Sequence, residues 1–105
     1  MQKFSDNLLM LDSADHVKRI ELYDESNQPA GIIENKPGTQ GSIKIYHHLF
    51  KVFGEINTDA AVEGLALYAE HTEDAEDHPG KHPNIDRLLN VLDKELTLNI
   101  KLITE

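Results

Sequence analysis

Three histidines in the second half of the chain, His71, His78 and His82, lie close together among several carboxylates. Imidazole and carboxylate groups are good ligands for zinc and other divalent transition metals. His78 and His82 have the spacing of one helical face, but Pro79 and Gly80 lie between them and should prevent a helix. A loop could still close around one ion. The sequence therefore allows a zinc or other divalent metal site, with locally hydrogen-bonded loop histidines as the alternative.

The loop from Asn35 to Ser42 is a second candidate, because it places a lysine and two glycines ahead of a predicted helix. Backbone amides exposed at a helix N-terminus attract anions. The loop is not a phosphate-binding P-loop, since Gly41 is not followed by lysine. The candidate anion-binding residues are Lys36, Gly38, Gly41 and Ser42. The alternative is a sharp connection in which proline and glycine serve geometry alone.

Carboxylates form a third pattern, on the second predicted helix. At 100° per residue, five of them fall within one narrow sector, which we name the acidic stripe. Its members are Asp59, Glu63, Glu70, Asp74 and Asp77. The stripe is either a solvated helix face or a docking surface for a basic protein, whose phosphate-binding groups could accept the acids as phosphate mimics.

Composition excludes several functions. The chain has 10 basic and 19 acidic residues and a formal net charge of −9, which disfavours direct binding to nucleic acid or anionic lipid. It has no cysteine, which rules out disulfides, thiolate metal sites and cysteine nucleophiles. Ser42 and Thr58 are better explained as helix caps than as nucleophiles, and no dinucleotide-binding glycine motif is present. No catalytic residue is predicted, and catalysis is less expected than its absence.

Hydrophobic periodicity predicts a mixture of strands and helices. The predicted strands are residues 17–23, residues 30–34 and, at the C-terminus, residues 96–102; the predicted helices are a short one behind Ser5, then residues 43–53, a second beginning at Asn57 or Thr58, and a third from Pro83. Ser42 is the expected cap of the helix at residues 43–53. The second helix should continue toward Asp77, with Val62 and Ala69 on its buried face.

These elements predict an α+β fold. We expect a small antiparallel sheet, made of a β-hairpin plus the C-terminal strand, with three helices packed on one face. The C-terminal strand should lie beside the first strand. Thr97, Asn99 and Lys101 would then face away from the helices, so a homodimer could form through the outer sheet face.

The chain is expected to be a single domain over residues 1–105, because this length supports one hydrophobic core. The N-terminus lacks the features of a signal peptide, and no segment reaches the roughly 20 apolar residues of a membrane-spanning helix. The expectation is a cytoplasmic protein that does not bind membranes.

Three stretches resemble a family of short bacterial proteins known as domain of unknown function 2322. They are residues 33–42, residues 63–72 and the run Pro-Gly-Lys-His-Pro-Asn-Ile-Asp-Arg-Leu-Leu at residues 79–89. The resemblance covers nearly the whole chain, and a run of this length is far more specific than a spaced motif. It implies a bacterial source and a complete domain, and it assigns no catalytic residue.

Two functions therefore remain open. The first is a non-catalytic interaction or regulatory module whose acidic stripe meets a basic partner. The alternative is a protein that binds a small molecule, an anion or a metal through the Asn35–Ser42 loop and the histidines at 71–82. The position of the pocket separates them, because a concavity that unites this loop with His71 and His82 favours a ligand.

Overall fold

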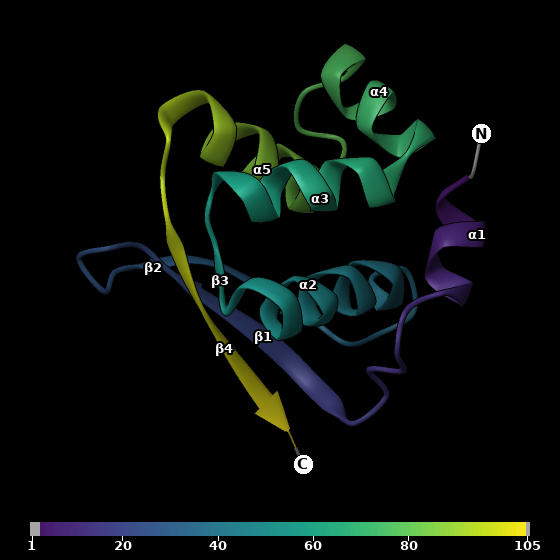
Figure 1. Cartoon of the computed structure of the whole chain (residues 1–105), viewed down its shortest axis with the longest axis horizontal. Helices are drawn as coiled ribbons and strands as arrows, with labels where there is room; N and C mark the ends of the chain where they lie inside the picture. The colour runs from purple at the N-terminus through teal and green to yellow at the C-terminus, as the bar shows by residue number, and fades with distance from the viewer. Residues whose placement is uncertain (1–2, 105) are drawn as a thin grey trace.

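The computed structural model describes residues 3–104 (Figure 1). It is an α+β fold in which those residues form a four-stranded antiparallel sheet and five helices. The strands are β1 (Val17–Tyr23), β2 (Pro29–Glu34), β3 (Glu55–Ile56) and β4 (Leu98–Thr104). The helices are α1 (Phe4–Leu9), α2 (Gln40–Phe53), α3 (Thr58–Tyr68), α4 (Glu70–Asp77) and α5 (Pro83–Lys94). The predicted fold class is confirmed, with five helices in place of three.

The sheet has the order β2-β1-β4-β3, so the C-terminal strand lies beside the first, as predicted. Successive side chains of a strand such as β1 point to opposite faces of the sheet. Ile20 and Leu22 are buried, while Glu21 between them lies on the opposite face across from Lys101 of β4. Val17 is buried as well, and the pairing with β4 shifts register between Val17 and Arg19. Thr97, expected on that outer face, precedes β4.

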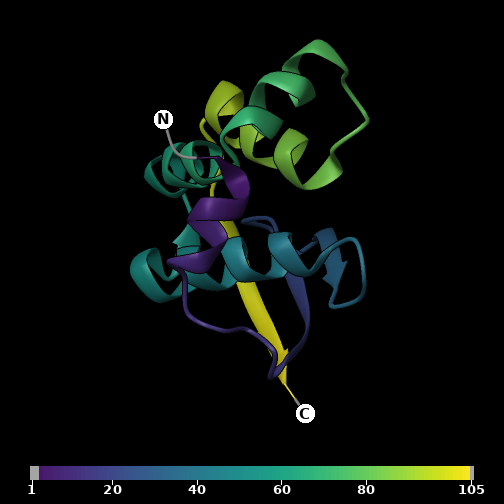
Figure 2. The ribbon, with the colours of Figure 1, turned by 90° about the vertical axis from the view of Figure 1, so that its right-hand side faces the viewer.

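The helices form two levels above the sheet (Figures 1 and 2). The buried side of α2 includes Ile43, Tyr46 and Leu49, and α2 contacts the strands. Beyond it, α3 and α5 pack together, and α4 stands farthest from the strands. Val62 is 57% exposed, so its predicted place on the buried face of α3 is wrong.

The second predicted helix is two helices, because the chain turns at Ala69. This residue has a φ of 52°, outside the helical region, and separates α3 from α4. The turn is supported by hydrogen bonds to the carbonyls at the end of α3: the Thr72 hydroxyl donates to the Leu65 carbonyl at 2.7 Å, and the Ala69 amide donates to the Ala66 carbonyl at 3.2 Å. Carbonyls at a helix end need such partners, which helix periodicity does not reveal.

None of the helices within residues 3–104 combines the length and the apolar character that crossing a membrane requires.

We expect Gly31→Ala to destabilise the protein by about 1–3 kcal/mol. Gly31 of β2 has a φ of 155°, and an added Cβ would lie 2.5 Å from an Nη atom of Arg87, whose guanidinium covers this position. Urea unfolding measures the change. Ser26→Ala, in the exposed turn of the same hairpin, is the control and should change stability by less than about 0.5 kcal/mol. Wild-type stability for Gly31→Ala would contradict this packing.

Acid should destabilise the protein partly through His47, which lies buried in α2. Burial lowers the pKa of His47 from its ordinary value of 6.5, so the folded state takes up this proton less readily than the unfolded chain. The stability that neutral His47 confers is therefore complete above pH 6.5 and is lost as pH falls below it. Urea unfolding at about pH 7.5 and pH 5.5 should show a smaller acid loss for His47→Gln than for wild type. Equal losses would contradict the assignment.

Candidate functional site

A pocket of about 490 Å³ is lined both by part of the predicted anion-binding loop and by two of the predicted metal-binding histidines, His71 and His82. Its lining comes from α1, the loop before α2, the ends of α2, α3 and α4 that face it, and the segment that enters α5. The lining residues are Phe4, Leu8, Gly38–Ser42, Tyr68, His71 and Lys81–Ile85. Figure 2 shows the N-terminal ends of α2 and α5 on the same side of the molecule.

The charge of this pocket differs from that of the chain as a whole. Its described lining contains Lys81, His71 and His82 and no aspartate or glutamate. The whole chain has 19 acidic residues against 10 basic ones. The lining therefore carries one cationic side chain, Lys81, and no carboxylate, while the Asp74 carboxylate that pairs with Lys81 lies outside it. This makes the pocket less unfavourable to anions than the acidic surface of the rest of the chain.

The N-terminus of α2 borders the pocket without a capping side chain. The helix begins at Gln40, earlier than predicted, and Thr39 at its N-cap makes no side-chain cap. The Thr39 hydroxyl instead donates to the Glu34 carbonyl. Ser42, which was expected to cap this helix, lies inside its first turn. The backbone amides of a first turn have no partner within the helix, and here no side chain accepts from them.

Ser42 has a different role, as the acceptor of a buried hydrogen bond. The Tyr68 hydroxyl donates to the Ser42 Oγ at 2.6 Å. Burial raises the pKa of Tyr68 and keeps its hydroxyl protonated. Because Ser42 accepts this hydrogen bond, its own hydroxyl hydrogen is available to a ligand.

Ring contacts define a direction along the pocket. The Phe4 ring stacks on Tyr68 with centroids 5.7 Å apart and meets His71 edge-on at 4.7 Å. His71 in turn lies 5.7 Å from His82. Gly41 permits this arrangement, since a Cβ there would lie 2.6 Å from the Phe4 ring. The pocket therefore passes from an apolar end at Phe4 to a basic end at His82.

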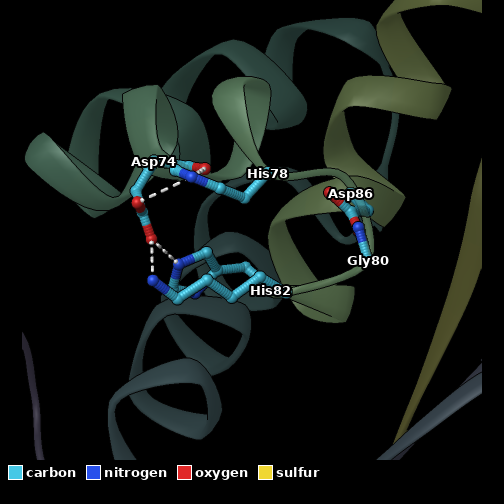
Figure 3. A network of polar contacts seen from close by, with 6 residues as sticks. Asp74, His78, Gly80, His82 and Asp86 are labelled. Atoms are coloured by element: carbon cyan, nitrogen blue, oxygen red, sulfur yellow. Dashed lines mark hydrogen bonds and ion pairs between the residues drawn. The ribbon is translucent and has the colours of Figure 1, made fainter.

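The basic end is fixed by the Asp74 carboxylate of α4 (Figure 3). It contacts His82 Nε2 at 2.6 Å, Lys81 Nζ at 3.0 Å and His78 Nδ1 at 3.2 Å. The same loop is bound to α5 by the Gly80 amide, which donates to the carboxylate of Asp86 at 2.9 Å (Figure 3). The loop between α4 and α5 is thus tied on both sides.

These contacts also set the protonation of the carboxylate. Hydrogen bonds from His82 and then Lys81 hold the pKa of Asp74 well below its ordinary value of 3.8. A carboxylate only accepts hydrogen bonds, so the Nε2 atom of His82 carries the hydrogen it donates. The Nδ1 atom of His82 is the ring nitrogen that this contact leaves unused.

The predicted anion loop lies partly in the pocket. Gly38, Gly41 and Ser42 belong to the lining, whereas Lys36 does not. The basic side chain of the site is instead Lys81, from a distant segment.

The predicted metal ligands are not gathered as a set of three. His71 and His82 are neighbours in the pocket, but His78 is exposed, contacts Asp74 and lies outside the lining. Within residues 3–104, no group of three or more histidine, aspartate or glutamate side chains could hold a metal ion.

The acidic stripe is not one surface, because α3 carries Asp59 and Glu63 and the separate helix α4 carries the others. Glu63 contacts His48 Nε2 at 3.1 Å. Glu70 accepts a hydrogen bond from the Phe4 amide at 2.7 Å, and this bond is the main reason that the pKa of Glu70 is lowered. Glu63, Glu70 and Asp74 therefore all contact groups of the same chain.

Sequence reasoning missed Phe4, Leu8, Tyr68 and Lys81 as pocket residues. Lys81 could have been found, because it lies between two candidate histidines in a Pro-Gly-Lys-His-Pro run. Phe4 and Leu8 could not, since only the docking of α1 against α2 and α3 brings them to the site.

The comparisons with known proteins agree with the sequence resemblance. The model of the family described as an uncharacterised protein conserved in bacteria (DUF2322) matches residues 4–102. The chain belongs to this family. No curated protein and no solved structure matches the chain. The family match spans every segment that lines the pocket, so the site lies wholly within the family's domain.

Asp74→Asn should loosen the loop between α4 and α5, because a neutral amide loses the ion pair with Lys81 and offers one acceptor oxygen in place of two. Hydrogen exchange at the Gly80 and Lys81 amides should become several-fold faster, with the sheet unaffected. The control is Asp77→Asn, an exposed acid of the same helix. Unchanged exchange in Asp74→Asn would show that the loop does not depend on this carboxylate.

Proposed function

We propose that this domain binds a small amphipathic anion in the pocket between α1, α2 and α5. The charged group lies at the end formed by Lys81 and His82, and the apolar part lies against Phe4 and Leu8. The proposal is one of binding and assigns no catalytic step.

The observation that carries this proposal is a pocket whose described lining contains Lys81 and no aspartate or glutamate, in a chain of net charge −9. Asp74, which pairs with Lys81, lies outside this lining. With 19 aspartates and glutamates, a concave surface without one is a marked departure from the rest of the chain. Lys81 and the uncapped first turn of α2 favour negative charge there.

The apolar end supports an organic ligand over a bare ion. Phe4, Leu8 and Pro83 contribute apolar surface, and the volume of about 490 Å³ lies within the range of small-molecule sites. An inorganic anion would leave most of this surface in contact with water, whereas an alkyl or aromatic group would cover it.

The alternative, a docking surface for a basic protein, has less support. Three of the five stripe residues make contacts within the chain, through His48, the Phe4 amide and the Asp74 cluster. A basic partner would have to compete with these contacts.

The test is an NMR titration with ligands that share an apolar body and differ in charge. Octanoate and benzoate, at about 1–10 mM, where even a weak site fills, should shift the amides of Gly41 and Ser42 and the ring signals of His82. Octylamine should not, because its ammonium meets Lys81.

Paired lysine variants locate the effect. Lys81→Gln should weaken octanoate binding several-fold, and Lys36→Gln, in the same loop as Gly38 but outside the lining, should leave it unchanged. Equal binding of octylamine, or no response at the pocket to either anion, would contradict the proposed function.

A further inference from the structure

Three separate segments contribute polar side chains to the pocket lining. Ser42 on α2 has a free hydroxyl hydrogen, since its oxygen accepts from Tyr68. Lys81 uses one of its three N–H groups on Asp74, at 3.0 Å. His71 on α4 lies against the rings of Phe4 and His82.

The types of donor in this pocket suit a phosphate better than a carboxylate. A carboxylate presents two oxygens in one plane, and its most common partner is the planar fork of arginine. No arginine is present in the described lining of this pocket. A phosphate monoester presents three terminal oxygens in three directions, and lysine binds phosphate as a point charge without a planar fork.

The apolar part of the pocket indicates which class of phosphate compound suits it. The ring series from Phe4 through His71 to His82 places the apolar end next to the basic end. One molecule can therefore put a phosphate at Lys81 and an apolar group at Phe4 and Leu8. Free phosphate would use only the first of these contacts.

We propose, on the basis of the proposed function, that the ligand is a phosphate monoester of an apolar, preferably aromatic, group. The phosphate binds Lys81, Ser42 and the first turn of α2, and the organic group covers Phe4 and Leu8. The structural basis is the side-chain chemistry of the pocket, with the uncapped α2 terminus as an additional source of donors.

Calorimetric and NMR titrations with phenyl phosphate, benzoate and inorganic phosphate test this proposal. Phenyl phosphate should bind at least about tenfold tighter than benzoate, because charge-assisted hydrogen bonds form to a third oxygen. It should also bind at least about tenfold tighter than inorganic phosphate, because its ring buries apolar surface. All shifts should centre on Gly41, Ser42 and His82.

Two variants assign the contacts. Lys81→Gln should remove most of the preference for phenyl phosphate over benzoate, and Lys36→Gln should keep it. Phe4→Leu should reduce the advantage of phenyl phosphate over inorganic phosphate. A circular dichroism spectrum and melting curve for each variant show that it is folded.

The outcomes separate this inference from the proposed function. Benzoate binding as tightly as phenyl phosphate at the pocket would overturn the phosphate assignment and leave an anion-binding pocket standing. Inorganic phosphate binding as tightly as phenyl phosphate would overturn the claim that the ligand carries an apolar group. No response to any of the three, together with none to octanoate, would overturn both.

Discussion

The pocket depends on one interaction above all, the contact of the Asp74 carboxylate with the loop between α4 and α5. That loop contains Pro79 and Gly80, so its own sequence provides little regular structure. Asp74 contacts His78, Lys81 and His82 and so ties the loop to α4. Since His82 and Lys81 supply the basic end, the chemistry of the site follows from the position of this one acid.

A second carboxylate of α4 holds the opposite wall of the pocket, which α1 forms. Glu70, one turn before Asp74, accepts from the Phe4 amide and so holds the start of α1. The Asn7 side chain, which donates to the Leu67 carbonyl at 2.9 Å, and Lys44, which donates to the Leu8 carbonyl at 2.7 Å, complete the attachment of α1. The short helix α4 therefore positions both walls, while its carboxylates stay out of the lining.

The strands β1, β2 and β4 and the last helix could be predicted because their patterns are local, whereas the two-residue strand β3 was not predicted. The alternation in β1 and the apolar spacing after Pro83 each need no distant contact, and both elements were predicted with close bounds. The break at Ala69 could not, since an alanine at positive φ carries no sequence signal. The same holds for the start of α2, where Thr39 bonds to Glu34 instead of capping.

The candidate site was predictable in its parts and not in its assembly. Glycine-rich turns and clustered histidines are visible in the sequence, and Gly41, Ser42, His71 and His82 do line one pocket. The roles of the acids were not visible, because one unbroken helix put Glu70 and Asp74 on an outward stripe. With the turn at Ala69, α4 is a separate helix, and these two acids contact α1 and the loop.

The central claim is that an amphipathic anion occupies this pocket in a fixed direction. The most direct test is a crystal structure of the protein grown with phenyl phosphate in an otherwise phosphate- and sulfate-free medium. The account predicts the phosphate within hydrogen-bond distance of Lys81 and Ser42 and the phenyl ring against Phe4 and Leu8. Phenyl phosphate bound elsewhere, or in this pocket with the ring at Lys81 and the phosphate at Phe4, would contradict it.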